Sequence, residues 1–323
     1  MSRYADGDRS LRLDPDSFSG GYFRNAVYRH WDPYEDIPGE LLARDRERLV
    51  ESDWTDEEFR GFRASVAKFG AGEEAVTEDL APLAIALDDI DDQMFVSSQI
   101  YEEAKHAAFF DRYWREVIDP VAEHHGMEVT APTDDRYFMP AYERLFDDTE
   151  AAMHRLLEAD TPENRVRAFC HYHLAVESVL AQTGYYGITS SFSERGDDLM
   201  VDDAPDFPNL EGLVKGVGLI RSDEGRHVGF GMHHVQQHLA NDDVDESVVQ
   251  DVLQEQMPNI ARIVSFSESG FLDAAPLVEY ASDKLTRRIE IITDSEAEIP
   301  DVEELVELDD GDTSTPSPST SDD

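Results

Sequence analysis

The sequence predicts an all-α protein whose core is a four-helix bundle with additional helices around it. Three observations carry this prediction. From Ile37 to about Lys284, apolar residues recur at three- and four-residue spacing. No segment of that span alternates apolar and polar residues long enough to predict a strand. Helix-capping sequences also stand at several points inside it, as expected for a chain of consecutive helices.

The two ends of the chain differ from this span in composition. Residues 1–35 are rich in Gly, Asp, Ser and Tyr and predict an irregular lead-in. Residues 36–290 predict one helical domain, in which the acidic stretch 197–208 is a loop. Residues 291–323 are acidic and then rich in Ser, Thr and Pro, so they predict a disordered tail.

Local signals predict several helix boundaries. Thr161-Pro162-Glu163 places a capping residue before Pro at the first helical position, with an acid in the first turn. A second capping cluster, Ser52 to Asp56, surrounds Trp54. We expect helices to end near the following glycines: Gly70, Gly184, Gly187 and Gly270.

The charge balance excludes whole classes of partner. The 323 residues include 27 basic and 72 acidic ones, a net charge of −45. A nucleic-acid binder with a basic face is excluded, because phosphate neutralisation needs clustered Lys and Arg. Docking on anionic membranes is disfavoured for the same reason. With only four lysines, the composition resembles that of cytosolic proteins from salt-loving archaea. A soluble, acidic mesophilic protein is the other interpretation.

Cysteine content and the N-terminal sequence bear on cellular location. The single cysteine, Cys170, excludes an internal disulfide and a cysteine zinc site. The segment from Met1 to Ser10 is polar and contains no apolar signal core. No stretch approaches the ~20 apolar residues that span a bilayer. We therefore expect a cytoplasmic protein without stable membrane insertion.

Glutamates interrupt the apolar stripes of four predicted helices. A carboxylate in a buried stripe is costly unless it is paired or binds a cation. Two stripes contain Glu-x-x-His, a spacing that places both side chains on one helix face. Each pair follows a stripe with a single Glu, and this repeated layout is the ligand set of a carboxylate-bridged dinuclear metal site. The candidate ligands are Glu73, Glu103, His106, Glu177, Glu224 and His227.

Charge and ligand type favour particular metals. Two divalent ions would cancel the charge of four buried carboxylates, and mixed carboxylate and imidazole ligands suit iron and manganese better than zinc. One Glu-x-x-His in a chain this rich in Glu is expected by chance on a solvated helix face, whereas the doubled layout favours metal binding. His173 precedes Glu177 by one turn. We favour a supporting or packing role for His173 over ligation.

The motifs resemble the ferritin-like superfamily and, within it, the ribonucleotide reductase small-subunit group. They are most similar to one branch of that group, the small-subunit-like ligand-binding oxidases. The resemblance covers roughly residues 31–281 and rests on GEEAVT at 72–77, EEAKH at 102–106 and DEGRH at 223–227. It implies a manganese–iron pair (di-iron being possible), dioxygen as oxidant, a long-chain fatty acid or similar apolar ligand beside the metals, and a homodimer.

The resemblance also implies roles for three further residues. Members of this branch form an ether crosslink between a Val and a Tyr, and the matching positions are Val76 and Tyr172. In an α-helix, five residues turn by about 500°, so Tyr172 would point roughly 140° away from Glu177. Asp223 matches an acidic position that hydrogen-bonds a ligand histidine from outside.

The leading interpretation is therefore a dioxygen-activating dinuclear metal oxidase. The alternative is a ribonucleoside-diphosphate reductase small (beta) subunit, which acts in deoxyribonucleotide synthesis. Two departures disfavour it: Phe110 stands where reductase subunits usually carry a radical tyrosine, and no Tyr or Trp follows Tyr280. An iron-storage cage and a lipid-binding protein with structural metals rank lower.

Overall fold

The computed structural model describes residues 13–193, 207–265 and 274–306. Within these ranges the chain consists of helices and connecting segments and contains no strand, which confirms the predicted all-α class. Most of the predicted loop 197–208, Gly270, the first ten residues and the end of the predicted tail lie outside the described residues. The described helices include none with the length and hydrophobicity that a membrane span requires.

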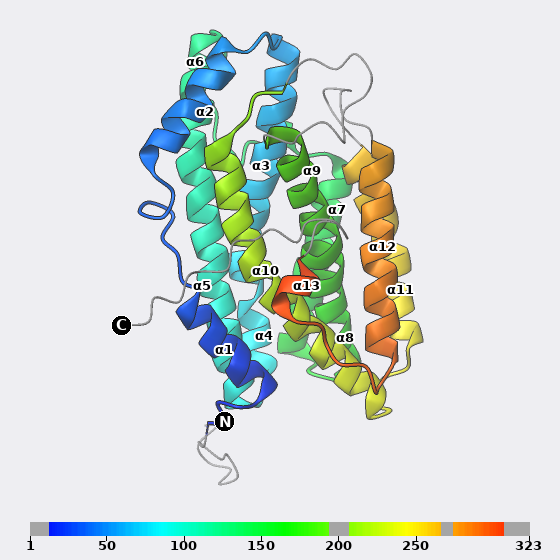
Figure 1. Cartoon of the computed structure of the whole chain (residues 1–323). Coiled ribbons are helices and arrows are strands. Elements are labelled where there is room, and N and C mark those ends of the chain that lie inside the picture. Colours follow the sequence, from blue (N-terminus) through cyan, green and yellow to red (C-terminus); the bar gives the residue numbers. More distant parts are fainter. Residues whose placement is uncertain (1–12, 194–206, 266–273, 307–323) are drawn as a thin grey trace, which may run out of the picture.

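The helices follow one another in the order seen in Figure 1. Their bounds are α1 (Phe18–Tyr28), α2 (Gly39–Glu51), α3 (Asp56–Asp79), α4 (Ala81–Ala86), α5 (Ile90–Tyr113), the π-helix η1 (Trp114–Ile118), α6 (Asp119–His124), the 3-10 helix η2 (Asp135–Tyr137), α7 (Pro140–Glu158), α8 (Pro162–Phe169), the π-helix η3 (Cys170–Ala181), α9 (Gln182–Phe192), α10 (Glu211–Ala240), α11 (Ser247–Ser265), α12 (Ala274–Thr293) and α13 (Val302–Leu305).

Four long elements form the central bundle. Helix α3 packs along α5, and α10 packs along the continuous run of α8, η3 and α9. Helices α7, α11 and α12 also pack against η3, and α12 contacts α10 as well. The architecture is that of a ferritin-like bundle with additional helices. Each element that carries a candidate ligand belongs to the central bundle.

Both capping predictions are confirmed. The Thr55 hydroxyl accepts a hydrogen bond from the Glu58 amide, and the Glu58 carboxylate accepts one from the Thr55 amide, a capping box that begins α3. The Thr161 hydroxyl accepts from the Asn164 amide at the start of α8. The apolar stripe Val76, Leu80, Leu83 and Leu87 that begins at Glu73, which its three- and four-residue spacing predicts as one helix, is divided between α3 and α4. Pro82 explains the break, because it cannot donate to the preceding turn.

The predictions for three of the four glycines were wrong. Gly70 lies inside α3, and Gly184 and Gly187 lie inside α9. A Cβ atom on Gly184 would stand 2.3 Å from Cζ of Phe69, and one on Gly70 would stand 3.3 Å from Cβ of Phe110. These glycines permit close approach between helices, a role that sequence alone does not separate from helix termination.

The predicted domain boundaries also need correction. The lead-in contains α1, whose first turn is capped by the Ser17 hydroxyl and which packs against α5. At the other end, α12 continues to Thr293, and α13 packs on α10. Buried Arg288 donates to the carbonyl of Leu305 and holds this segment down. Helices α1 and α13 are too short to show a helical period in the sequence, although each buries apolar side chains.

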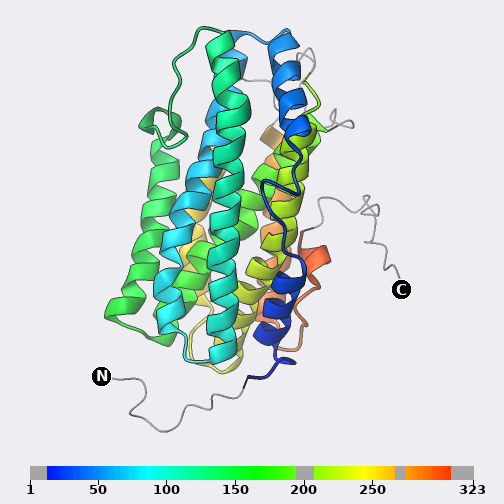
Figure 2. The ribbon, with the colours of Figure 1, turned by 90° about the vertical axis from the view of Figure 1, so that its left-hand side faces the viewer.

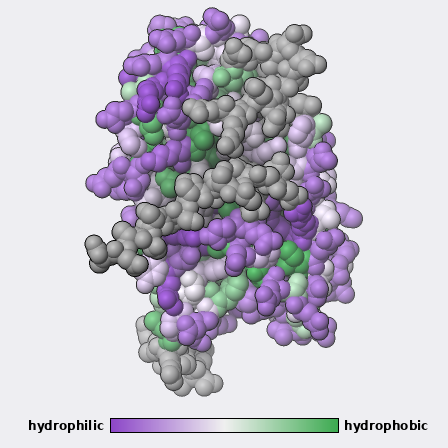
Figure 3. Space-filling view, in the orientation of Figure 1, coloured by the Kyte–Doolittle hydropathy of each residue, from purple (hydrophilic) through white to green (hydrophobic). Residues whose placement is uncertain are grey.

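The charge of −45 predicts a fold that depends on salt. Hydrophilic residues predominate on the face shown in Figure 3. Like charges on one compact body repel, and molar salt shortens the screening length to about 3 Å. We expect the unfolding temperature to rise by about 6 °C between 0.1 M and 3 M potassium chloride, the shift that about 4 kcal/mol produces in a protein of this size. Calorimetry measures it, and an uncharged osmolyte is the control. A temperature that stays flat in salt would contradict this prediction.

Candidate metal centre

The structure brings all six candidate ligands together at the centre of the bundle. Helix α3 contributes one Glu, η3 contributes another, and α5 and α10 each contribute a Glu-x-x-His pair. Their ligand atoms form two groups in which every atom lies within 4.8 Å of the others. The first group is Glu73, Glu103, His106 and Glu224, and the second is Glu103, Glu177 and His227. Because Glu103 belongs to both groups, it is the residue that would help to hold either ion.

The first group surrounds Nδ1 of His106. This nitrogen lies 3.2 Å from Oε2 of Glu103, 3.5 Å from Oε2 of Glu73 and 3.5 Å from Oε1 of Glu224. All four side chains are buried. Burial raises the pKa of Glu73 to about 8. At neutral pH and without a cation, the Glu73 carboxyl therefore holds a proton.

The second group surrounds Nδ1 of His227. This nitrogen lies 3.1 Å from Oε1 of Glu103 and 3.5 Å from both Oε1 of Glu177 and Oε2 of Glu224. Burial raises the pKa of Glu177 and of Glu224. Burial also disfavours the charged form of Glu103, but the two histidines outweigh it and hold its pKa well below the usual range.

Three ligand atoms in these groups make no hydrogen bond although they are buried: Oε2 of Glu177, Oε2 of Glu224 and Nδ1 of His227. Buried polar atoms in proteins normally have a hydrogen-bond partner, so three buried ligand atoms without one at a single place require an explanation. Metal ions would take up these lone pairs and balance the carboxylate charge. The donor set, four carboxylates and two imidazoles, fits two transition-metal ions.

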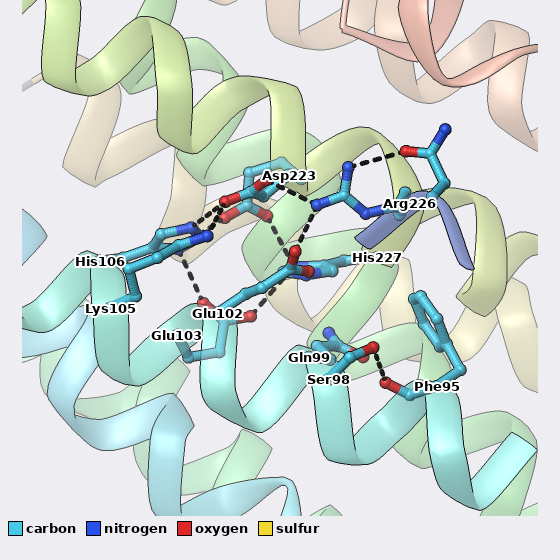
Figure 4. Close-up of polar contacts among 12 residues, drawn as sticks. Phe95, Ser98, Gln99, Glu102, Glu103, Lys105, His106, Asp223, Arg226 and His227 are labelled. Atoms are coloured by element: carbon cyan, nitrogen blue, oxygen red, sulfur yellow. Dashed lines mark hydrogen bonds and ion pairs between the residues drawn. The ribbon is translucent and has the colours of Figure 1, made fainter. Parts of the chain in front are cut away.

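Asp223 occupies the place that the sequence predicted, beside a histidine of the site. Its Oδ2 lies 3.1 Å from Nε2 of His106 (Figure 4). The same oxygen accepts a hydrogen bond from Nε1 of Trp31 at 2.8 Å and lies 2.8 Å from Nζ of Lys105. Burial opposes ionisation of Asp223, but His106 and the neighbouring cations outweigh it and hold its pKa far below the usual range. The acid therefore fixes the orientation of the imidazole.

The sequence analysis did not identify Glu102, which contacts His227 in the way that Asp223 contacts His106. Oε2 of Glu102 lies 2.9 Å from Nε2 of His227, and the Arg226 guanidinium bonds both Glu102 and Asp223 (Figure 4). The signal was present in both motifs, EEAKH and DEGRH, where an acid precedes the candidate ligand Glu and a cation precedes the His. Each outer acid contacts the histidine of the opposite motif, so the arrangement has an internal two-fold symmetry.

Two further residues that support the candidate ligands were not predicted. Gln99 donates through Nε2 to Oε1 of Glu177 at 2.9 Å, and its Oε1 lies 3.4 Å from Nε2 of His173. Tyr185 donates from its hydroxyl to Oε1 of Glu73 at 3.0 Å. His173 lies in neither ligand group. Burial lowers its pKa well below the usual range, so the ring is neutral and supports the site through Gln99.

Tyr172 lies closer to the candidate ligands than α-helical geometry predicted. It belongs to η3, a π-helix, and not to an α-helix. Hydrogen bonds in a π-helix join residues five apart, so Tyr172 and Glu177 lie nearly one above the other and not about 140° apart. The Tyr172 hydroxyl donates to Oε1 of Glu103 at 2.9 Å. Val76 lines the same cavity as Tyr172 and the four glutamates.

This cavity has a volume of about 220 Å³, many times the ~10–15 Å³ that one water requires. Along α3 it extends from Glu58 to Val76. From Glu58 to Glu73 the helix rises about 22 Å, so the cavity is elongated and the candidate ligands lie near one end. Away from them, aromatic and aliphatic residues dominate its wall, among them Phe62, Phe69, Phe146, Leu180, Ile188 and Phe192.

No protein-family profile matches the sequence. Among solved structures, the chain is similar to R2-like ligand-binding oxidases. A tyrosine-to-phenylalanine variant with an aerobically reconstituted Mn/Fe cofactor is 26% identical, covers 86% of this chain and 94% of its own, and has a TM-score of 0.72. A valine-to-leucine variant with an anaerobically reconstituted Mn/Fe cofactor is 25% identical over 88% and 96%, at 0.73. A glycine-to-leucine variant with an aerobically reconstituted Fe/Fe cofactor is 25% identical over 86% and 94%, at 0.71.

Proposed function

We propose that this chain is a dioxygen-activating oxidase that holds two metal ions through Glu73, Glu103, His106, Glu177, Glu224 and His227. The observation that carries the proposal is the pair of ligand groups that share Glu103. The unpartnered ligand atoms inside these groups and the Mn/Fe cofactors of similar structures support it. The test is aerobic reconstitution of the metal-free protein with iron and manganese, with a Val76–Tyr172 crosslink as the readout.

Manganese with iron is the proposed pair, and two irons are the second possibility. Similar structures carry either combination. Carboxylate-rich ligand groups suit both metals, and a single imidazole in each group adds the nitrogen ligand that iron accepts readily. The two groups are unequal, because only the first contains Glu73. Unequal coordination gives the chain a means of binding two different metals.

The chain's own residues provide the substrate of a crosslinking reaction. When bound, the reduced metal pair would supply dioxygen activation and two of the four electrons that reduce dioxygen to two waters. The other two electrons come from the chain. Val76 loses the hydrogen on its β-carbon, Tyr172 loses its hydroxyl hydrogen, and a C–O bond joins them. Two further protons from solvent complete the two waters.

The positions of both residues support this reaction. Val76 follows Glu73 by one turn of α3 and so shares its face. Burial raises the pKa of Tyr172 well above its usual value, so the phenol carries its proton at neutral pH. The hydrogen bond to Glu103 holds the phenol oxygen 2.9 Å from Oε1 of Glu103 and so fixes the orientation of the phenol. Both side chains belong to the buried core, which excludes bulk water.

We further propose that the cavity binds a long apolar ligand with an acidic head, such as a long-chain fatty acid. Its apolar wall matches an alkyl chain, and its length of about 22 Å along α3 gives room for one. If its carboxylate head lay at the end of the cavity where the candidate metal-binding residues lie, it would contact the metal ions. We include a homodimer and a cytoplasmic location in the proposal.

The reductase small-subunit alternative is less well supported. Phe110 is buried and stacks on Phe69 at 5.6 Å between ring centroids, so no phenol occupies this position. After Tyr280 the chain contains neither Tyr nor Trp that could carry a radical toward a larger partner. Co-purification with a large catalytic subunit would revive the alternative.

Glu102→Gln should weaken metal binding in the group that contains His227. The amide keeps the side-chain shape but removes the negative charge that faces Nε2 of His227 at 2.9 Å. Substitutions of such supporting acids typically cost about 10–100-fold in metal affinity. Competition with a chelator measures the affinity of each ion. We expect Glu74→Gln, a change at an exposed neighbour of Glu73, to leave both affinities unchanged. Equal affinities in the two variants would show that Glu102 plays no such role.

A further inference from the structure

A second cavity lies against α3, on the side that faces away from the elongated cavity. It has a volume of about 380 Å³, and its wall is formed by α3 and by the segment 125–137 that leads from α6 toward α7. In Figure 2 this segment runs from the upper end of α6 down to η2, which packs against α3. The two cavities share no lining residue. At 3.6 residues per turn, positions 60 and 63 of α3 point away from positions 65 and 69, which line the elongated cavity.

Basic side chains predominate in the wall of this second cavity. Its charged and imidazole side chains are Arg60, Arg63, His125 and Arg136 against two acids, Asp56 and Glu128. The whole chain has the opposite balance, with 27 basic and 72 acidic residues. A cavity in which arginines outnumber acids is therefore exceptional on this protein, and its local charge favours an anion.

Arg63 is a buried cation that lacks an anionic partner. Its side chain is only 4% exposed. It forms no ion pair with any acid that the structure describes, whereas buried Arg112 and Arg226 each contact a carboxylate. Arg288 also bonds carbonyls alone, but it lines neither cavity. A buried charge is costly unless an opposite charge or hydrogen bonds compensate it, so Arg63 calls for a partner from outside the chain.

The guanidinium of Arg63 still has N–H groups to offer. Its Nη2 donates to the carbonyl of Glu128 at 2.9 Å and to the hydroxyl of Thr130. Within the described part of the chain, Nε and Nη1 make no hydrogen bond, and of these two only Nε is fully enclosed. Nη1 is therefore open to a molecule in the cavity. The rings of Trp114 and Tyr137 lie 5.4 and 5.6 Å from the guanidinium and fix its orientation before any ligand binds.

We propose that this cavity binds the phosphate group of a small molecule. Guanidinium groups match phosphate oxygens in both charge and hydrogen-bond geometry. Arg63 is the buried donor, and Arg60 and Arg136 stand at the rim, where their side chains are 60% and 47% exposed. Each rim arginine contacts an acid, but a guanidinium has more N–H donors than one carboxylate engages. Nε2 of His125, buried and without a partner among the described residues, adds a polar atom to the same wall.

The size of the cavity favours a ligand larger than the bare ion. Its volume of about 380 Å³ falls in the range of about 300–1,000 Å³ that is typical of small-molecule sites. Ala64, Met127 and the ring of Tyr137 supply apolar wall for the body of such a ligand. We therefore expect a phosphate monoester to bind more tightly than inorganic phosphate, which is the other source of the same chemistry.

A bound phosphate would tie the segment 125–137 to α3. Arg60 and Arg63 belong to α3, whereas His125 and Arg136 belong to the segment. Arg63 precedes Glu73 by ten residues of the same helix, about 15 Å along its axis. The site is thus separate from the candidate metal centre, and the inference does not depend on the proposed oxidase chemistry.

Titration of the full chain with inorganic phosphate and with ribose 5-phosphate tests the proposal. Calorimetry measures the affinity, at one concentration of potassium chloride that keeps every variant folded. Arg136→Gln should weaken the binding of both probes about 10-fold, because it removes a charge-assisted hydrogen bond. Arg155→Gln is the matched control, since Arg155 lies on α7, is similarly exposed and also pairs with a Glu. It should bind both probes as the wild type does. Equal affinity for the two probes would assign free phosphate to the site.

Arg63→Gln should abolish binding, and circular dichroism verifies its fold. Because Arg63 also bonds the segment 125–137, Arg60→Gln and Arg136→Gln carry the test if that variant does not fold. Hydrogen exchange is the second measurement: phosphate should slow exchange of the backbone amides of 126–137 in the wild type and not in Arg136→Gln. Folded wild-type protein that binds neither probe at about 10 mM would overturn the proposal. Rim variants that bind both probes as tightly as the wild type would overturn it as well.

Discussion

Replacing Glu103 with alanine should remove at least one metal ion per chain, and more metal than Glu177→Ala removes. Glu103 contributes to both ligand groups, whereas Glu177 contributes only to the second. Without Glu103, the two histidines also lose the carboxylate that lies 3.2 Å from one Nδ1 and 3.1 Å from the other. The measurement is the metal content per chain by mass spectrometry, after loading and removal of free metal.

Glu74→Ala is the matched control for these variants, because Glu74 is an exposed glutamate next to a candidate ligand. It should retain both ions. A second readout is proton release: at pH 7, loading the metal-free protein should expel protons, because burial raises the pKa of Glu73 and because, although burial opposes it, the neighbouring carboxylates raise the pKa of His106 and His227. Full occupancy in both Glu103→Ala and Glu177→Ala would refute the proposed ligand set.

The parts of the site that sequence predicted are those encoded by local spacing. Glu-x-x-His places two side chains on one helix face wherever the helix lies, so Glu103 with His106 and Glu224 with His227 could be identified in advance. Glu102 was not assigned, although it holds in EEAKH the position that Asp223 holds in DEGRH. In sequence it is one more acid in an acidic helix, and only the packing of α5 against α10 brings its carboxylate to His227.

The π-helix η3 shows a second limit of sequence reasoning. Apolar and polar residues there follow no clear period, so the pattern gave no measure of residues per turn. We predicted Tyr172 from the usual α-helical geometry, and the i to i+5 bonding of η3 moved it onto the side of Glu177. Gly184 was wrongly predicted to end a helix, because a glycine in a helical pattern often does. In the structure it lies inside α9, and the ring of Phe69 packs where a side chain would be.

In aerobic protein loaded with iron and manganese, we expect a peptide that joins Val76 to Tyr172. The pair loses two hydrogens, about 2 Da, when the C–O bond forms, and removal of a tertiary C–H hydrogen lies within the chemistry that such metal pairs perform. Tyr172→Phe should abolish the joined peptide completely, because phenylalanine has no oxygen to form the bond. Its metal content should stay unchanged, since Tyr172 only donates a hydrogen bond to Glu103. Peptide mass spectrometry after digestion measures both outcomes.

Tyr185→Phe is the matched control for the crosslink. Tyr185 lines the same cavity, is as deeply buried as Tyr172 and donates its hydroxyl to Glu73 instead of Glu103. Loss of its hydroxyl should leave the joined peptide in place, because its phenol oxygen takes no part in the bond. Aerobic, fully metallated wild-type protein that yields only separate peptides would exclude the crosslinking reaction. The dinuclear metal site would stand in that case, because its support is the geometry of the six ligands and not the reactivity of Tyr172.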